Sequence, residues 1–223
     1  MAYGINDSGQ VVGWSNILGE SAYHATIWES AYHATIWNGT TPTDLGTLGG
    51  SISQAWDIND SGQVIGISST SDGVSHATIW NGTTPTDLGT LTGSRGAHSG
   101  AYGINDSGQV VGWSYTSGGN EHATLWNGTT LTDLNNFLSR SDVNAGWVLS
   151  EAYGINDNSW IIGMANNRFT GGLHAFLLNP CDTCPINIAQ DFAPLPEPET
   201  YALFMAGLGL MGFIARRRKN SQA

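Results

Sequence analysis

The stretch AYGINDSGQVVGWS occupies residues 2–15 and recurs without a change at 101–114. A close copy, AWDINDSGQVIGIS, lies at 55–68, and a diverged one, AYGINDNSWIIGMA, lies at 152–165. The copies begin 53, 46 and 51 residues apart. A period of about 50 residues is typical of propellers and solenoids, in which each repeat is one supersecondary unit. The chain is therefore expected to be an array of repeats.

A second motif alternates with the first. It reads HATIWNGTTPTDLGTL at 33–48 and 76–91, HATLWNGTTLTDL at 122–134 and HAFLLNP at 174–180. In each unit the NDSG turn joins two strand-like segments, and Asn-Gly predicts a second tight hairpin. Two hairpins make one four-stranded unit, which must stack on its neighbours to bury its faces. We predict an all-β fold: a propeller-like or solenoid array of about four four-stranded units, followed by a single C-terminal transmembrane helix.

The predicted organisation has three parts. The first is a β-repeat domain over residues 1–180, with units at approximately 2–48, 55–91, 101–134 and 152–180. A linker with a CxxC pair and several prolines follows at 181–199, and a membrane and sorting tail occupies 200–223.

One irregularity lies inside the first unit, where ESAYHATIW occurs twice in tandem, at 20–28 and 29–37. Without those nine extra residues, the 53-residue spacing would come close to the 46 residues of the next unit. Nine is odd, so threading both copies through one strand would exchange its buried and exposed faces. We predict that one copy loops out or forms an extra edge strand.

Charge is divided unevenly along the chain. All 18 acidic residues lie within 1–199, where the basic residues are Arg95, Arg140 and Arg168, while the part from 200 onward carries four basic residues. Because residues 1–199 are so acidic, nucleic acid and an anionic membrane surface are not expected as their partners. Solubility outside the cell explains this charge more simply than specific cation binding does.

Repeated polar residues are candidates for sites. The histidines of the second motif are His24, His33, His76, His122 and His174. One histidine per unit is what a structural repeat produces, so we expect strand-start histidines with satisfied hydrogen bonds; a metal would need several to converge. The aspartates that follow Asn in the first motif are Asp7, Asp60, Asp106 and Asp157. They are expected in turns, and they lack the ligand spacing of a calcium loop.

Tryptophans recur with the repeats, as Trp14, Trp28, Trp37, Trp80, Trp113 and Trp126. We expect them to pack between strands, and the alternative is an exposed aromatic platform for sugars. The triplets that begin at Asn38, Asn81 and Asn127 match a glycosylation sequon, although a hairpin explains them more simply. No catalytic motif stands out, so we predict no catalytic residue, metal site or cofactor; a carboxylate pair assembled from distant loops stays open.

The two cysteines, Cys181 and Cys184, stand in the segment CDTC. A single pair supplies two ligands where a structural zinc needs four, and the βαβ context of a redox motif is missing. We expect a local disulfide or two idle thiols.

The C-terminal segment PLPEPETYALFMAGLGLMGFIARRRKNSQA differs from the rest of the chain. Tyr201 to Ala215 carries no charge, and as a helix it would span about 22 Å of the roughly 30 Å hydrocarbon core. The residues Arg216, Arg217, Arg218 and Lys219 form a basic cluster of the kind that stays cytoplasmic. The stiff proline spacer before the run and this cluster after it argue against a buried helix of the soluble domain. We predict a membrane helix with the body outside.

Pro196, Glu197 and Pro198, an apolar helix and an arginine cluster follow one another here, and together they resemble the PEP-CTERM sorting signal of Gram-negative bacteria. That resemblance implies recognition by a membrane-embedded exosortase, cleavage near Pro-Glu-Pro and transient residence in the inner membrane. It also implies delivery to the cell surface or extracellular matrix, often in bacteria that make exopolysaccharide.

The linked body motifs resemble the extracellular HAF repeat, whose His-Ala-Phe triplet is retained at His174, Ala175 and Phe176. That resemblance implies a secreted β-repeat protein with no known activity. The first residues, MAYGINDSGQ, lack the basic and apolar regions of a signal peptide. Because an exported protein needs such a signal, we expect the true start to lie upstream of Met1.

The leading hypothesis is a non-enzymatic, exported repeat protein of the cell surface or biofilm matrix that is a substrate of exosortase. One alternative is a carbohydrate-binding or adhesive module that uses the Trp-rich loops. A less favoured alternative is a secreted hydrolase.

Overall fold

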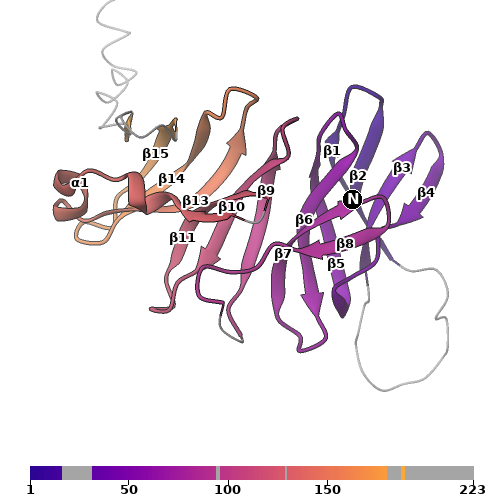
Figure 1. Cartoon of the computed structure of the whole chain (residues 1–223), viewed down its shortest axis with the longest axis horizontal. Coiled ribbons are helices and arrows are strands. Elements are labelled where there is room, and N and C mark those ends of the chain that lie inside the picture. The colour runs from indigo at the N-terminus through magenta and orange to yellow at the C-terminus, as the bar shows by residue number, and fades with distance from the viewer. Residues whose placement is uncertain (17–31, 94–95, 129, 180–186, 189–223) are drawn as a thin grey trace, which may run out of the picture. The chain divides into compact units, whose positions relative to one another are not determined.

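The structure is a computed structural model, and it describes residues 1–16, 32–93, 96–128, 130–179 and 187–188. The compact unit Met1–Ile188 contains four sheets, each of four antiparallel strands (Figure 1). In every sheet the strands lie side by side in chain order, so each sheet is a meander joined by hairpins. The predicted all-β class and its four-stranded units are confirmed.

The four sheets have the following strands. The first contains β1 (Ala2–Ile5), β2 (Gln10–Asn16), β3 (Tyr32–Asn38) and β4 (Thr41–Asp44). The second contains β5 (Gly49–Ile58), β6 (Gln63–Thr70), β7 (Ser75–Asn81) and β8 (Thr84–Asp87). The third contains β9 (Ser99–Ile104), β10 (Gln109–Tyr115), β11 (Glu121–Asn127) and β12 (Thr130–Asp133). The fourth contains β13 (Trp147–Ile155), β14 (Ile161–Asn167), β15 (Leu173–Leu178) and β16 (Asn187–Ile188).

Two short helices, a 3-10 helix at Leu134–Phe137 and α1 at Arg140–Asn144, connect the third sheet to the fourth. The last strand, β16, lies within the residues 181–199 that the sequence assigned to a linker. The fourth unit reads HAFLLNP and has no NGTTPTD segment, so its final strand comes from further along the chain. The repeat domain therefore continues to Ile188.

The NDSG turn closes the first hairpin of each unit as predicted. In the first sheet the Gly9 N–H donates to the Asn6 carbonyl at 2.9 Å, and Gly9 has φ +76°. Glycine adopts this left-handed backbone conformation with little steric strain, whereas residues with a Cβ do so at a cost in free energy. The fourth unit has Ser159 at this position, with φ +61°, and it is the one non-glycine residue with positive φ in the described part of the chain.

A bulge in the first strand of every sheet lies opposite a glycine of the second strand. In the third sheet Ala101 pairs with Gly112 and Gly103 pairs with Val111, so Tyr102 is the extra residue. A Cβ at Gly112 would collide with the carbonyl oxygen of Gly100 on the first strand. The glycine of QVVGW is thus needed for close backbone approach, and the bulge re-aims the aromatic side chain beside it.

The second copy of the tandem repeat, at 29–37, supplies the third strand of the first sheet. β3 begins at Tyr32, and its ladder with β2 runs from Gln10 opposite Asn38 to Asn16 opposite Tyr32. The turn chemistry explains this choice, because Asn38 pairs with Thr41 across a two-residue loop whose first residue, Gly39, has φ +60°. The first copy, at 20–28, lies outside the described residues.

Apolar layers between consecutive sheets form the core. Val12 and Ala34 of the first sheet pack with Ile58, Val64 and Trp80 of the second. The same positions meet between the second and third sheets, and between the third and fourth. Each fully buried aliphatic side chain contributes about 1.5–3 kcal/mol, so stacking of the sheets stabilises the array, as expected of repeats.

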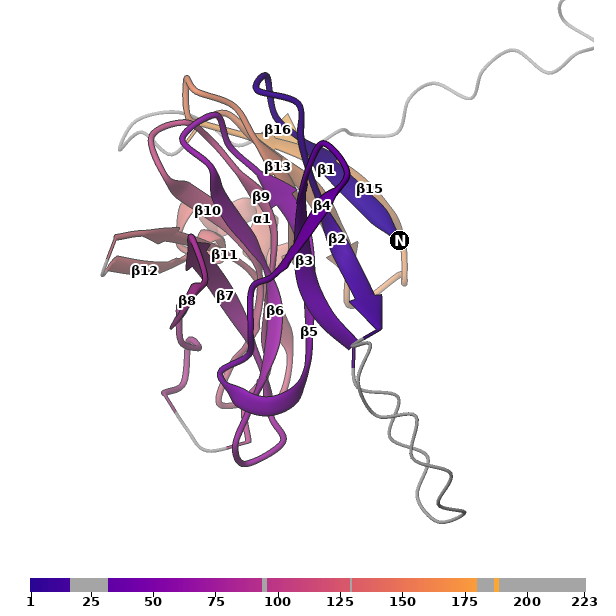
Figure 2. The same ribbon diagram turned by 90° about the vertical axis from the view of Figure 1, so that its right-hand side faces the viewer.

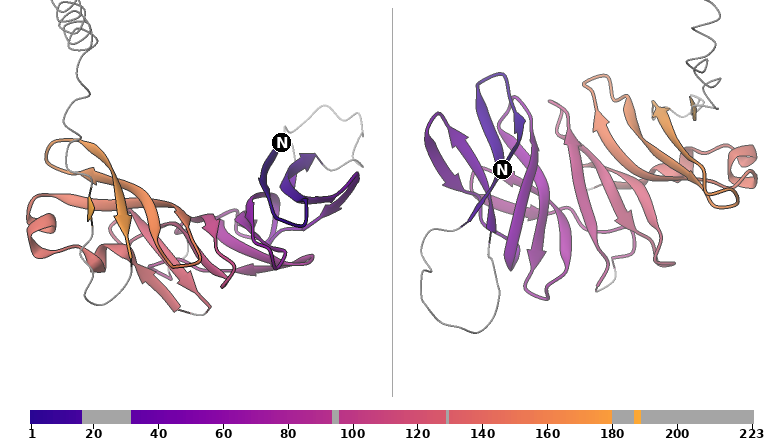
Figure 3. Two further views of the ribbon diagram at one scale, coloured as in Figure 1. Left: turned by 90° about the horizontal axis from the view of Figure 1, so that it is seen from above. Right: turned by 180° about the vertical axis from the view of Figure 1, so that it is seen from behind.

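The sheets follow one another in a row, with the first and the fourth at its two ends (Figure 3). Contacts between sheets centre on the first strand of each following sheet, because β5, β9 and β13 pack on the sheet before. A closed propeller would bring the last sheet back onto the first. The described residues do not form such a ring, so a closed propeller is not the arrangement seen.

Side-chain amides join the turns of consecutive sheets. Asn6 Nδ2 donates to Gln10 Oε1 of its own turn at 2.8 Å and to the Asn59 carbonyl of the next sheet at 3.2 Å. Asn59 and Asn105 repeat the second bond, to the carbonyls of Asn105 and Asn156, each at 3.1 Å. These three donors are buried. Each asparagine therefore closes one turn and holds the next sheet in place.

The aspartates of IND form a parallel series of bonds. The backbone N–H of Asp7 donates to Asp60 Oδ1 at 2.9 Å, Asp60 donates to Asp106 Oδ1 at 3.0 Å, and Asp106 donates to Asp157 Oδ1 at 2.9 Å. The prediction that these aspartates lie in turns is confirmed. The carboxylates of Asp60, Asp106 and Asp157, however, each accept a hydrogen bond from the backbone of the preceding sheet. We call the asparagine and aspartate bonds together the IND ladder.

The predicted membrane helix, Tyr201 to Ala215, lies outside the described residues. Among the residues that the structure does describe, no helix has the length and apolar character needed to cross a membrane.

The IND ladder predicts unequal effects of the same substitution in two sheets. Asn105→Ala removes two bonds inside its turn and one to the next sheet, and it leaves buried polar groups unpaired, so we expect a loss of about 2–3 kcal/mol in unfolding free energy. Asn156→Ala keeps the incoming bond to its carbonyl and removes only exposed turn bonds, so we expect about 1 kcal/mol or less. Urea denaturation measures both, and equal losses would contradict the role of the ladder.

Candidate functional site

Each of the first three sheets contains one histidine–aspartate pair. His33, His76 and His122 are each the second residue of the third strand of their sheets, and their Nδ1 atoms lie 2.8, 2.7 and 2.6 Å from a carboxylate oxygen. The partners are Asp44, Asp87 and Asp133, each at the end of the fourth strand. The prediction of satisfied strand-start histidines is confirmed for these three, and their partners come from the TPTD and TLTD segments.

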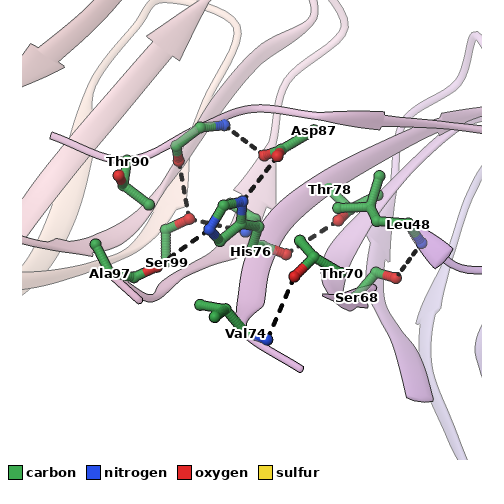
Figure 4. Close-up of polar contacts among 12 residues, drawn as sticks. Leu48, Ser68, Thr70, Val74, His76, Thr78, Asp87, Thr90, Ala97 and Ser99 are labelled. Carbon is green, nitrogen blue, oxygen red and sulfur yellow. Dashed lines mark hydrogen bonds and ion pairs between the residues drawn. The ribbon is translucent and has the colours of Figure 1, made fainter. Parts of the chain in front are cut away.

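The second sheet shows the most complete of these pairs (Figure 4). His76 Nδ1 donates to Asp87, and Nε2 donates to the Ala97 carbonyl at 3.1 Å. Asp87 also accepts the Gly89 N–H at 2.7 Å. Both ring nitrogens face acceptors, so the doubly protonated ring satisfies the site best.

Ser99 lies beside this pair, and the grouping could be mistaken for a catalytic triad. Its hydroxyl donates to the Gly89 carbonyl at 2.9 Å and accepts the Ala77 N–H at 2.9 Å. His76 Nε2 is held by Ala97, so the ring has no nitrogen free to take a proton from a serine. The arrangement therefore ties the second sheet to the third.

Titration of the pair follows from these contacts. The hydrogen bond to Asp87 raises the pKa of His76 above its ordinary 6.5, although burial opposes this. Burial pushes the pKa of Asp87 upward, but the bonds from His76 and from the Gly89 N–H outweigh it and lower that pKa below 3.8. The pKa of Asp133 is lowered in the same way by His122 and Asn135 against the effect of burial.

The bulged aromatic residues form a row across consecutive sheets. Trp56 stacks on Tyr102 with ring centroids 5.0 Å apart, and Tyr102 lies 5.4 Å from Tyr153. Burial, together with the charge of Glu151, raises the pKa of Tyr102 to about 12, so its phenol stays neutral. We call these three residues the aromatic row.

In the described part of the chain, clefts lie at junctions between sheets. One, of about 440 Å³, is lined by Tyr32 of the first sheet and by Gln54, Trp56, Ser69 and Thr70 of the second, among others. The Trp56 indole N–H donates to Gln54 Oε1 at 3.2 Å. An aromatic face, an amide and several hydroxyls are thus brought together in one cleft.

The second cleft, also of about 440 Å³, lies between the third and fourth sheets. Its lining includes Glu121, His122, Ser150 and Arg168, and it is more polar than the first. Among the described residues, no group of three or more His, Cys, Asp or Glu side chains is arranged to hold a metal ion.

The recurring tryptophans divide between core and surface. Trp80 and Trp126 are fully enclosed between sheets, which confirms packing for these two, whereas Trp14, Trp37 and Trp113 are half-buried. Sequence reasoning missed the aromatic row, because Trp56 and the tyrosines of AYGIND were not considered as one repeated position. His24 and Trp28 lie outside the described residues. The His174 ring packs against the Trp147 ring, with the two ring centroids 4.7 Å apart.

The residues predicted to direct sorting all lie outside the described part of the chain, as do both cysteines. They are Cys181, Cys184, Pro196, Glu197, Pro198, Tyr201, Ala215, Arg216, Arg217, Arg218 and Lys219. These residues make up the predicted cleavage motif, membrane helix, basic anchor and disulfide. Because they lie outside the described residues, all four features stay predictions.

Comparison with known families bears on this tail directly. Residues 194–219 match the family model of the PEP-CTERM protein-sorting motif, which supports the predicted C-terminal sorting signal. No curated protein and no solved structure matches the chain. The likeness of the body to HAF repeats stays a prediction.

The His76–Asp87 pair predicts a measurable pH effect. Because the pKa of His76 is raised in the folded state, its stabilising contribution is complete below pH 6.5 and is lost as the pH rises through the folded value. Asp87→Asn should return the pKa of His76 towards 6.5 and remove this dependence, which we expect to amount to about 1 kcal/mol or less for so exposed a pair. NMR titration of the His76 ring and urea denaturation at pH 6 and pH 8 measure the two effects.

Asp72→Asn is the matched control, since Asp72 lines the same surface without bonding His76. A His76 pKa that does not change in the Asp87→Asn variant would show that the pair is not the cause of the shift.

Proposed function

We propose that the chain is an exported protein of the cell surface or extracellular matrix that exosortase-type machinery recognises through its C-terminal tail. The observation that carries this proposal is the PEP-CTERM sorting motif at residues 194–219. A motif of this kind indicates passage through the membrane to the outside. In this proposal the tail directs the protein to the exosortase-type machinery, which cleaves the tail off. The repeat domain remains as the mature protein.

The charge distribution supports the proposal. The matched residues include Arg216 to Lys219, the basic cluster of an otherwise acidic chain. Such a cluster holds the end of an apolar segment on the cytoplasmic side while the preceding residues face outward. An acidic body is well suited to stay soluble after release.

The geometry of the repeat domain supports a structural role without catalysis. The repeated histidines and aspartates bond to each other and to the backbone of neighbouring segments. Their repetition in three sheets is what a stacking function requires, whereas an active site is expected once. We therefore propose a non-enzymatic repeat domain.

Processing of the tail is the direct test of the sorting proposal. In the native host we expect the exported wild-type protein to end near Pro198 by intact mass. Glu197→Ala should abolish this cleavage and leave Ala223 in place, while the matched variant Glu199→Ala, outside Pro-Glu-Pro, should be cleaved as the wild type is. An exported wild-type protein that retains Ala223 would refute the proposal.

A second candidate function is binding of extracellular polysaccharide, and the cleft around Trp56 favours it. Tyr32 and Trp56 supply aromatic surface there, and Gln54, Ser69 and Thr70 supply hydrogen-bonding groups. Sugar rings offer both an apolar face and hydroxyls, so this combination suits them. Binding to exopolysaccharide would fit a protein of the matrix.

Removing one ring tests the second candidate. We expect Trp56→Ala to weaken binding to the host exopolysaccharide by about tenfold, which corresponds to 1.4 kcal/mol. Trp56→Tyr should restore most of the affinity, and Trp160→Ala, an exposed tryptophan outside the cleft, should leave it unchanged. Isothermal titration calorimetry measures the affinities, and equal binding by all four proteins would exclude this cleft.

A further inference from the structure

The polar cleft between the third and fourth sheets contains two opposite charges that do not neutralise each other. Arg168 and Glu121 both line this cleft of about 440 Å³, and within the described residues neither forms an ion pair. The Arg168 guanidinium donates only one long bond, to the Val143 carbonyl at 3.4 Å, and lies 5.1 Å from the centre of the Phe169 ring. The Glu121 carboxylate accepts no hydrogen bond from the described residues. Both charged groups can therefore still bond a ligand.

The histidine–aspartate pair at this cleft differs from its counterpart in the second sheet. The strands of the two sheets spread in the same order, with β8 and β12 on the same side of the array (Figure 2), so the two pairs occupy equivalent places. His76 Nε2 bonds the Ala97 carbonyl, but His122 Nε2 has no partner among the described residues. The loop that supplies Ala97 is replaced by two short helices between the third and fourth sheets. His122 thus lines the cleft with one ring nitrogen unpaired.

Aromatic surface and amides complete the lining. Glu121 lies directly opposite Tyr115 in the ladder of β10 and β11, so both side chains are on the same face of the third sheet. The half-buried Tyr115 ring is held by Trp113, with ring centroids 5.4 Å apart. Asn120 and Asn166 add two side-chain amides. The cleft therefore combines one aromatic ring with groups that donate and groups that accept.

This combination favours an uncharged sugar over a charged ligand. A guanidinium only donates hydrogen bonds and a carboxylate only accepts them, whereas each sugar hydroxyl does both. An anion would be attracted by Arg168 but repelled by Glu121, and a cation would meet the reverse. A neutral sugar satisfies both side chains at once. The volume of about 440 Å³ also fits, because small-molecule pockets measure about 300–1,000 Å³.

We propose that this cleft binds a neutral sugar unit of a polysaccharide. Arg168 donates to sugar oxygens, Glu121 accepts from sugar hydroxyls, and the Tyr115 ring contacts the apolar face of the sugar. His122, oriented by its bond to Asp133, adds a further hydrogen bond. Glu121 also discriminates against acidic sugars such as uronates, because their carboxylate would lie near an unpaired negative charge. The ligand class is that of the second candidate function, but the site lies at a different junction and does not depend on the Trp56 cleft.

Calorimetry with defined oligosaccharides tests this site. The full-length wild type, in a detergent without a sugar head group, is titrated with neutral hexasaccharides of β-glucan, α-glucan, xylan and mannan, and with hexagalacturonate. We expect at least one neutral hexasaccharide to bind with a Kd of about 1 mM or lower. Hexagalacturonate should bind at least about tenfold more weakly, because Glu121 repels it.

Two variants remove one charge each. Arg168→Gln should weaken binding of the neutral hexasaccharide about tenfold. Glu121→Gln should weaken it about fivefold but strengthen binding of hexagalacturonate, since the repulsion is gone and Arg168 remains. A merely structural role of Glu121 would not reverse the selectivity in this way. Arg140→Gln changes an exposed arginine on α1 that does not line the cleft, and it should bind as the wild type does. Far-ultraviolet circular dichroism and urea midpoints check that every variant is folded.

Three outcomes would overturn the inference. A wild type that binds none of the neutral hexasaccharides would show that the cleft is not a sugar site. If Arg168→Gln binds as the wild type does and Trp56→Ala does not, the sugar lies in the Trp56 cleft, and the second candidate function stands without this site. If Glu121→Gln weakens both kinds of ligand alike, the selection by charge is wrong. Tail cleavage is measured separately, so the sorting proposal is unaffected by these results.

Discussion

The amide of Asn59 closes a turn and joins two sheets at once, and the rest of the array depends on this double use. Its oxygen accepts the Gln63 N–H, while its nitrogen donates to Gln63 Oε1 and to the Asn105 carbonyl. A side chain with both donor and acceptor groups is required, so neither aspartate nor leucine could replace it. Because the residue is buried, an error in the spacing of sheets would leave it unpaired at a cost of about 1–3 kcal/mol. The amide therefore specifies how far apart sheets lie.

The bulges likewise join two strands within a sheet and also contribute to the contact between sheets. A glycine on the second strand allows the first strand to approach closely, and the extra residue opposite it is the aromatic one. Trp56 and Tyr102 consequently stack between sheets instead of within one sheet. The aromatic row is thus the product of one local irregularity repeated along the chain. The aromatic row and the IND ladder both join neighbouring sheets, which could not bury their apolar faces alone.

The strands and hairpins could be predicted because their signals are local: NDSG, Asn-Gly and alternating segments lie within a few residues of each other. The partners of His76 and Asn59 could not be found in that way, since strand pairing and sheet stacking bring them together from separate segments. One clue was nevertheless present, because each paired aspartate follows its histidine by 11 residues. Closure into a ring was not decided by the sequence, since the repeat period alone does not fix the angle between sheets. For the sorting tail the order Pro-Glu-Pro, apolar run and basic cluster is itself the evidence, and the structure adds no geometry to it.

The position of the extra tandem copy shows at which connection between strands a sheet accommodates additional residues. Gly39 selects the copy beside it for β3, so all of the extra chain falls between Asn16 and Tyr32, in the connection of β2 to β3. The corresponding connection in the second sheet runs only from Thr70 to Ser75. Lengthening a loop is inexpensive, about 0.6 kcal/mol for each doubling, whereas a shift of register within β3 would turn the buried Ala34 outward. This end of a sheet is thus a natural place to graft a foreign peptide for display, and the opposite end, where Asn6 and Asp7 hold the next sheet, is not.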